Sequence, residues 1–302
     1  MGRVPTVAVW HTVLILRNAL EKSIMRSQSS MEYLMTYIWA ILIMGVVIAA
    51  LFELGVFGNS TPRAHPGSCA VVINRFGGAS LSGQCTEQPP EFVAQLDGSG
   101  SYITGNVPIA GASSMTASLW VYLQASGAQQ DLANFGGGSG NNQLVPYVSS
   151  TNVFHCWTNA ADVSSGIILS EDKWYFLSCA YDGSTLDSYV NGMLASSGSL
   201  SGFSTSLSTF SLGADMGPGD ATAGYYTNGQ ISNLQVYNTA LSSNSISALY
   251  TEGIGGSPID LSNLVGWWPL NGNADDYSGN GYDGNTIDIS YTGSWVNAYS
   301  QP

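Results

Sequence analysis

Residues 173–192 read KWYFLSCAYDGSTLDSYVNG, and this stretch decides the fold class. An aromatic and apolar run, Lys173–Tyr181, ends in the turn signal Asp-Gly-Ser, and a second run, 186–190, ends in Asn191-Gly192. Asn-Gly is a strong hairpin signal because both residues tolerate a positive φ angle. Two short runs joined and bounded by turn residues predict a pair of antiparallel strands.

The same pattern continues on both sides of this hairpin. Residues 116–123 (TASLWVYL) alternate apolar side chains with other side chains, and residues 229–238 (GQISNLQVYN) predict another strand. One short helix is expected to start at Ser242 or Ser243, either of which can cap it, and to end at Gly253. Many strands with one small helix indicate a mainly β, antiparallel sandwich or jelly roll.

Six blocks of sequence have the order and spacing of one family. They are 95–103 (QLDGSGSYI), 117–122 (ASLWVY), 173–175 (KWY), 181–184 (YDGS), 189–192 (YVNG) and 228–242 (NGQISNLQVYNTALS). Over about residues 90–255 the chain resembles the laminin G-like, concanavalin A-like lectin/glucanase jelly roll. The resemblance implies a sandwich of two sheets, and carbohydrate binding is the association most common in that family.

The C-terminal tail resembles the opening of such a domain. Residues 264–281 (LVGWWPLNGNADDYSGNG) match the segment that usually comes first, yet here they come last. They either supply strands to the same sandwich, as in a permuted chain, or pack against a neighbouring subunit. We expect the first arrangement and therefore assign residues 90–302 to the jelly roll.

Near the N-terminus, residues 33–52 (YLMTYIWAILIMGVVIAALF) carry no charged side chain. A helix rises ~1.5 Å per residue, so this run would cover the ~30 Å core of a membrane. The alternative is a buried core helix. We predict one long apolar helix over residues 28–57, with the N-terminus in the cytoplasm and the later domain outside, because basic residues gather before the run. They are Arg3, Arg17, Lys22 and Arg26.

The junction before this helix, RSQSSMEYLMTY, resembles the N-terminus of archaeal type IV pilins with class III signal peptides. The resemblance implies a leader over residues 1–27 and cleavage between Ser27 and Gln28. Glu32 then becomes the fifth residue. A glutamate at the edge of an apolar helix is costly to bury alone, so the α-amine of a neighbouring subunit could neutralise it and set the stagger of packed helices. The alternative is that Glu32 lies in the headgroup region.

These features predict a structural subunit of an archaeal type IV pilus-like surface filament. The helix would span the membrane before assembly and then polymerise with those of identical subunits. The jelly roll would be displayed outside for adhesion or carbohydrate binding. The alternative is a non-polymerising, membrane-anchored, lectin-like protein of the cell surface. Residues 58–89 are assigned as a linker, in which Asn59 begins the one Asn-x-Ser/Thr sequon and is a glycosylation candidate.

Four cysteines follow the helix, on the side predicted to be oxidising, and an even number there suggests two disulfides. Three pairings are open from the sequence. We favour Cys69–Cys85 and Cys156–Cys179 because both are local.

The charge of the outer region restricts its partners. From residue 58 onward the chain has 17 acidic and 3 basic residues, a net charge of −14. Such a surface would repel nucleic acid, so no nucleic-acid partner is expected.

No enzyme activity is expected. Retaining glucanases need two carboxyl groups ~5 Å apart, which on one strand would require a Glu-x-Asp-x-Glu-like run, and the sequence has none. The adjacent Glu171 and Asp172 would point to opposite faces of a strand. No G-x-S-x-G nucleophile motif is set between a strand and a helix.

Calcium is the one cofactor that the sequence suggests, because it takes six to eight oxygen ligands. Asp97 lies in an Asp-Gly-Ser turn of the family pattern, and Asp276, Asn280 and Asp283 form a second oxygen-rich loop. Ser232 stands where many relatives have aspartate, which removes a carboxylate from a family-type site. The alternative is that these residues form Asx turns, which bond their own backbone.

Aromatic side chains in an exposed loop are the candidates for stacking on sugar rings. Tyr225 and Tyr226 lie in such a loop, between glycine-rich stretches. The four tryptophans of the predicted strands are instead assigned to the core. They are Trp120, Trp174, Trp267 and Trp268.

Overall fold

The computed structural model of this chain describes residues 37–47, 69–73, 78–83, 85, 89–137, 142–215 and 224–302. The predictions for the leader, for cleavage between Ser27 and Gln28, for Glu32 and for Asn59 lie outside these residues. The chain divides into two compact units, Met1–Asn59 and Ser60–Pro302, and each is described by itself.

In the first unit, residues 37–47 are helical, and the side chains of this helix are exposed. This segment lies inside the apolar helix predicted over residues 28–57, the rest of which is not described. Within the described ranges, no helix has the length and hydropathy that crossing a membrane requires.

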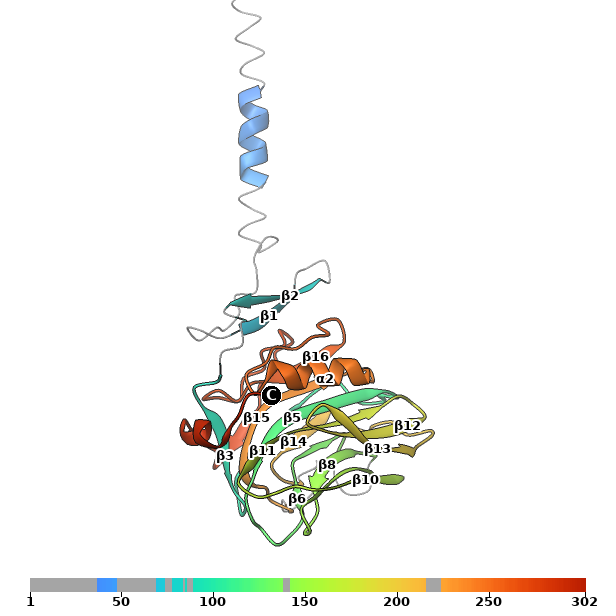
Figure 1. Ribbon diagram of the computed structural model, residues 1–302. Coiled ribbons are helices and arrows are strands. Elements are labelled where there is room, and N and C mark those ends of the chain that lie inside the picture. Colours follow the sequence, from blue (N-terminus) through green and yellow to red (C-terminus); the bar gives the residue numbers. More distant parts are fainter. Residues whose placement is uncertain are drawn as a thin grey trace, which may run out of the picture. The chain divides into compact units, whose positions relative to one another are not determined.

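The second unit is mainly β (Figure 1). Its described elements, in chain order, are β1 (Cys69–Ile73), β2 (Ala79–Gly83), β3 (Val93–Asp97), β4 (Tyr102–Asn106), β5 (Met115–Leu123), β6 (Gln130–Asp131), β7 (Ala133–Phe135), β8 (Leu144–Val148), β9 (Val153–Thr158), β10 (Ala161–Ile168), β11 (Lys173–Tyr181), β12 (Thr185–Val190), β13 (Met193–Ser199), β14 (Thr209–Leu212), β15 (Asn228–Tyr237), α2 (Ser243–Glu252), β16 (Leu264–Trp268), β17 (Asn285–Ile287), β18 (Ser290–Thr292) and the 3-10 helix η1 (Ser294–Ala298).

Two antiparallel sheets form the sandwich. The β8 sheet has the order β10-β9-β8-β7-β14-β4-β17, with β6 beside β8. The β5 sheet has the order β13-β12-β11-β5-β15-β3-β18, with β16 beside β15. This arrangement confirms the predicted mainly β, antiparallel jelly-roll sandwich.

The hairpin predicted from residues 173–192 is present. Strands β11 and β12 pair antiparallel, with Leu177 opposite Val190. Asn191 and Gly192 have φ angles of 50° and 74°, the left-handed conformation that the Asn-Gly turn signal predicts. Gly192 is also required by packing, because an added Cβ would meet the Tyr250 side chain at 2.8 Å.

The C-terminal tail completes the same sandwich. Strand β16 pairs with β15, β17 pairs with β4, and β18 pairs with β3, so the tail adds strands to both sheets. This confirms the permuted-chain expectation for residues 264–281.

Two hydrophobic cores result. The main core lies between the sheets and receives Leu119 and Val121 from β5. The second lies on the outer face of the β5 sheet and contains Trp120, together with Ile246 and Leu249 of α2. Figure 1 shows α2 and β16 on the side of β5 and β15, while β8 and β10 lie on the other side.

All four tryptophans predicted as core are at most 8% exposed, which confirms that assignment. The predicted helix is confirmed as well: the Ser242 side chain accepts a hydrogen bond from the Ser245 amide, and Gly253 ends the helix with a φ angle of 82°.

Both favoured disulfides are confirmed. Cys69–Cys85 closes the β1–β2 hairpin, which lies in the segment assigned as a linker. Cys156–Cys179 joins β9 to β11 and therefore links the two sheets through the main core. The β1–β2 hairpin also packs on the second core through Ala70 and Val71, so it is part of the second unit.

Candidate functional site

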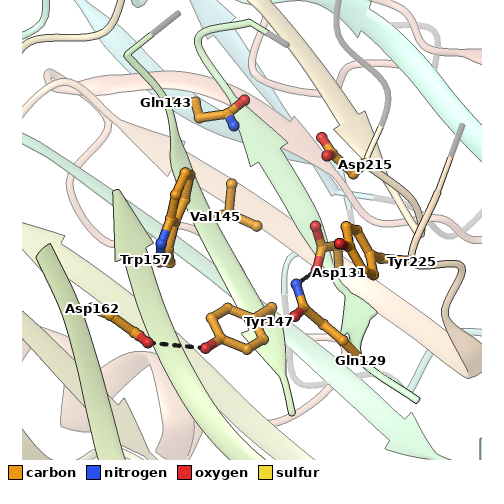
Figure 2. Close-up of a pocket in the computed structure, with 9 residues that line it drawn as sticks. All are labelled: Gln129, Asp131, Gln143, Val145, Tyr147, Trp157, Asp162, Asp215 and Tyr225. Carbon is orange, nitrogen blue, oxygen red and sulfur yellow. Dashed lines mark hydrogen bonds between the residues drawn. The ribbon is translucent and has the colours of Figure 1, made fainter. Parts of the chain in front are cut away.

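A cavity of about 350 Å³ opens on the outer face of the β8 sheet (Figure 2). Strands β8, β9 and β10 form its base, and the segments before β6, after β14 and before β15 form its rim. Nine described residues line this cavity: Gln129, Asp131, Gln143, Val145, Tyr147, Trp157, Asp162, Asp215 and Tyr225.

Strand alternation aims these side chains outward. Leu144 and Val148 of β8 belong to the main core, whereas the intervening Val145 and Tyr147 line the cavity. In β9, Cys156 points into the core and the adjacent Trp157 points out. Successive side chains on a strand face opposite sides, so the same alternation that fills the core also builds the cavity.

Asp131 is the most buried charged group of the cavity, with 3% of its surface exposed. Gln129 Nε2 donates a hydrogen bond to its Oδ1 at 2.8 Å, while its Oδ2 receives none from the described residues. Burial is the main cause that raises the pKa of Asp131, the hydrogen bond from Gln129 opposes it, and the charge of Asp215 adds to it, for a pKa of about 7.

A buried amide holds two of the lining side chains. Asn134 Nδ2 donates to Asp215 Oδ1 at 2.6 Å and to Gln143 Oε1 at 2.8 Å. The backbone N–H of Gln143 in turn donates to Asn159 Oδ1 at 3.0 Å. These bonds fix the orientation of Asp215 and Gln143 before any ligand binds.

Asp162 of β10 holds the side chains at the other end of the cavity. Tyr147 donates its hydroxyl to Asp162 Oδ2 at 3.1 Å, and His155 Nδ1 lies 2.9 Å from Asp162 Oδ1. The Tyr147 and His155 rings stack with their centroids 4.7 Å apart. Burial and the neighbouring Asp162 charge both raise the pKa of the Tyr147 phenol, so it stays protonated and donates.

Aromatic faces form two walls. Figure 2 shows Trp157 on one side of Val145 and Tyr225 beside Asp131 on the other. Tyr225 is 55% exposed, in a segment tied to the rim because the Asp131 amide donates to the Tyr225 carbonyl at 2.8 Å. Flat aromatic faces beside polar groups are the surfaces on which sugar rings stack.

The two tyrosines proposed from the sequence, Tyr225 and Tyr226, have different surroundings in the structure. Tyr225 lines the cavity, whereas Tyr226 packs towards Tyr102, with ring centroids 6.3 Å apart. Asp131, Tyr147, Trp157 and other lining residues were not predicted. The outward positions of alternating strands could have indicated Tyr147 and Trp157, but no local signal marks Asp131.

The predicted calcium ligands form hydrogen-bonded turns. Asp97 accepts hydrogen bonds from the amides of Ser99, Gly100 and Ser101, which hold the pKa of its carboxyl well below the usual range. Among the described residues, no group of three or more His, Cys, Asp or Glu side chains is placed to hold a metal ion. Calcium at Asp97 stays a prediction.

The second predicted calcium loop, with Asp276, Asn280 and Asp283, is also held by hydrogen bonds within the protein. Asp276 Oδ1 accepts from the Trp267 and Ser278 amides, and the Asp276 amide donates to Asp283 Oδ1 at 3.0 Å. Asn280 Nδ2 donates to the Val265 carbonyl at 3.2 Å. These bonds bring the three predicted ligands into one loop and fasten that loop to β16.

Comparison with known proteins agrees with this fold. The family described as "Concanavalin A-like lectin/glucanases superfamily" matches residues 97–247, half of the chain. No curated protein matches.

Among solved structures, the chain is similar to a putative carbohydrate binding protein from Bacteroides ovatus, with a TM-score of 0.55, 13% identity, and coverage of 76% of this chain and 70% of that one. It is also similar to the heptameric SAP-like pentraxin from Limulus polyphemus, with a TM-score of 0.49, 14% identity, and coverage of 67% and 95%. A third is the CBM40 domain of the Ruminococcus gnavus IT-sialidase bound to α2,3-sialyllactose, with a TM-score of 0.41, 17% identity, and coverage of 55% and 99%.

Proposed function

This chain belongs to the concanavalin A-like lectin/glucanases superfamily, and from that premise we propose that it is a non-catalytic carbohydrate-binding protein of the cell surface. Its sugar site is the cavity on the outer face of the β8 sheet. The observation that carries the proposal is that the aromatic walls, Trp157 and Tyr225, line the same cavity as aspartate and glutamine side chains.

The chemistry of the cavity fits a sugar. A pyranose offers an apolar face of C–H groups and a ring of hydroxyls. The aromatic walls suit the face, while the oxygens of Asp131 and Gln143 suit the hydroxyls. The volume of about 350 Å³ is at the lower end of ligand pockets, which fits one or two sugar rings rather than a long chain.

Two neighbouring tyrosines give a matched test. Glycan-array screening of the full chain, with and without calcium, identifies a ligand, and calorimetry then measures its affinity for two variants. We expect Tyr225→Ala to weaken binding by about two- to tenfold, the scale of losing one stacking aromatic. Tyr226→Ala should leave affinity unchanged because that ring packs towards Tyr102. Equal effects of the two variants would exclude this cavity as the site.

Hydrolysis is a second candidate function, favoured by one observation. Asp131 and Asp215 are neighbouring carboxyl groups, and the raised pKa of Asp131 is what a general acid needs. Chromatography of the best array ligand after prolonged incubation separates the two functions. Intact sugar supports the binding protein, whereas cleavage products that disappear in Asp131→Asn would establish an enzyme.

We propose further that the N-terminal segment places this domain on a type IV pilus-like filament. The support is the RSQSSME junction before the apolar run and the excess of basic residues ahead of it. Residues 1–27 would be removed as a leader, and the helix over 28–57 would pack among identical helices. A membrane-anchored lectin without a filament is the rival.

Two experiments decide between filament and anchor. Mass spectrometry of the mature N-terminus should find Gln28, and an intact leader would favour the anchor. Glu32→Ala should abolish filaments seen by electron microscopy while leaving membrane insertion intact, because only the register of packed helices needs the carboxylate. Filaments of normal length in that variant would refute the register role.

A further inference from the structure

The lining of the cavity has one sign of charge. Three of its described residues are aspartates, Asp131, Asp162 and Asp215, and none is a lysine, arginine or histidine. The one lysine or arginine in the described ranges is Lys173, which begins β11 in the other sheet. A ligand in this cavity therefore meets carboxylates without a compensating basic side chain from the lining.

Asp131 and Asp215, the inner pair of carboxylates, are the groups that distinguish a cationic ligand from an anionic one. Asp131 is 3% exposed, and its Oδ2 receives no hydrogen bond from any described residue, so one oxygen is available to a ligand. Asp215 is close enough for its charge to act on Asp131. Two nearby carboxylates in a desolvated site repel each other, and a cation between them relieves that repulsion. An anion would add to it.

Asp162 contributes less to this selection. Its two oxygens are engaged by the Tyr147 hydroxyl and by His155 Nδ1. The aromatic walls act in the same direction as the inner pair. The faces of Trp157 and Tyr225 attract a cation, whereas they offer nothing to a carboxylate.

We infer that the cavity selects its sugar by charge: it takes a pyranose that carries a protonated amine in preference to the same ring N-acetylated, and it excludes rings that carry a carboxylate. This inference rests on the proposed function, since it names the sugar class for the same site. It follows from the Asp131 and Asp215 carboxylates lying together between aromatic walls, in a cavity without a basic residue in its described lining.

The test compares matched rings on the full chain. Calorimetry measures glucosamine, N-acetylglucosamine and glucuronic acid, together with the corresponding galactose derivatives, at a pH where the amine is protonated and Asp131 can ionise. We expect the amine to bind about tenfold more tightly than its N-acetyl form, the free-energy scale of one partly desolvated ion pair. The uronic acids should show no binding.

Charge-removing variants show whether the effect is local. Asp131→Asn and Asp215→Asn keep the shape of each side chain. In these variants the ratio of the affinity for the amine to the affinity for its N-acetyl form should fall towards one. Asp288→Asn removes the same charge from the exposed turn between β17 and β18 and should leave the preference intact. A preference that falls equally in Asp288→Asn would reflect the general negative field of the protein and overturn the inference.

The outcomes separate this inference from the proposed function. Binding of neutral sugars that depends on Tyr225, with no amine preference, would overturn the charge selection and leave the sugar site standing. Tight binding of a uronic acid would do the same. Failure of all these rings to bind contradicts the charge selection, and the neutral glycans of the array then decide whether the site binds sugar at all.

Discussion

At the scale of single residues, Asp131 carries the chemistry of the cavity. It ends the short strand β6 and is only 3% exposed. Folding places this carboxyl where its charged form is poorly solvated, so the protein bears a cost whenever Asp131 is ionised. A site that keeps such a group without a basic partner in its described lining is prepared for a ligand rather than for stability.

That cost has a pH signature. The pKa of Asp131 rises from 3.8 to about 7 on folding, so the folded chain binds this proton more tightly than the unfolded chain. The contribution of Asp131 to stability is therefore favourable at low pH and is lost as pH rises from about 4 to about 7. We expect Asp131→Asn to remove this loss and to stabilise the chain by roughly 2–4 kcal/mol at about pH 8.

Denaturant unfolding of the wild type, Asp131→Asn and Asp288→Asn across this pH range measures the effect. Asp288 is exposed, so its removal controls for the change in net charge. Parallel stability curves for the wild type and Asp131→Asn would contradict the raised pKa.

The residues of the cavity also show where prediction from sequence stops. Tyr225 could be proposed because an aromatic side chain in a glycine-rich loop is conspicuous. Asp131 and Asp215 could not, because they are 84 positions apart and become neighbours only through the pairing of β14 with β7. Trp157 was not predicted either, because an alternating strand shows two faces but not which of them is covered.

At the scale of elements, the C-terminal tail is what closes the sandwich. Its two adjacent tryptophans serve different cores: Trp267 packs in the second core, while Trp268 lies in the main core, 4.5 Å from the Phe210 ring. Their alternation along β16 therefore fastens the tail to both layers. This is why a segment that resembles the start of such a domain can stand at its end.

We expect Trp268→Ala to destabilise the second unit by about 3–5 kcal/mol, because it empties a fully buried indole site and loses the bond from Nε1 to the Tyr282 carbonyl. Val296→Ala, at a 56% exposed position of the same tail, should change stability by less than about 0.5 kcal/mol. Thermal unfolding of both variants measures the difference. A mild effect of Trp268→Ala would mean that the tail is dispensable.

Local signals were enough to predict the β11–β12 hairpin and helix α2. The Asn-Gly turn, the Ser242 cap and the Gly253 stop each act within a few residues, so the sequence shows them directly. The order of strands in the two sheets depends on contacts between distant segments; the family resemblance implied a sandwich of two sheets, but the sequence predicted no strand order.

At the scale of the whole molecule, the two disulfides have different roles. Cys156–Cys179 ties the β8 sheet to the β5 sheet inside the main core, whereas Cys69–Cys85 closes one hairpin outside the sandwich. Replacing Cys156 and Cys179 together by alanine should lower the free energy of unfolding by about 3 kcal/mol, the value for a loop of this length.

The matched control replaces Cys69 and Cys85, which should loosen the β1–β2 hairpin while shifting the main unfolding transition less. Calorimetric scans of the two double variants compare them. A larger loss from the hairpin pair would mean that the sandwich depends on β1 and β2.

The distribution of elements over the molecule explains why the cavity lies where it does. Helix α2 and η1 cover the outer face of the β5 sheet, while β9 and β10 keep exposed or half-buried side chains on the outer face of the β8 sheet. The aromatic and acidic side chains of that accessible face form the cavity, and its use as a sugar site is the central claim.

The most direct test of that claim is a crystal structure of the full chain. The crystals are soaked with the best ligand from the glycan array. We predict a pyranose ring in the cavity, stacked on Trp157 or Tyr225 and hydrogen-bonded to Asp131. An ordered sugar elsewhere on the domain, with the cavity occupied only by solvent, would contradict it.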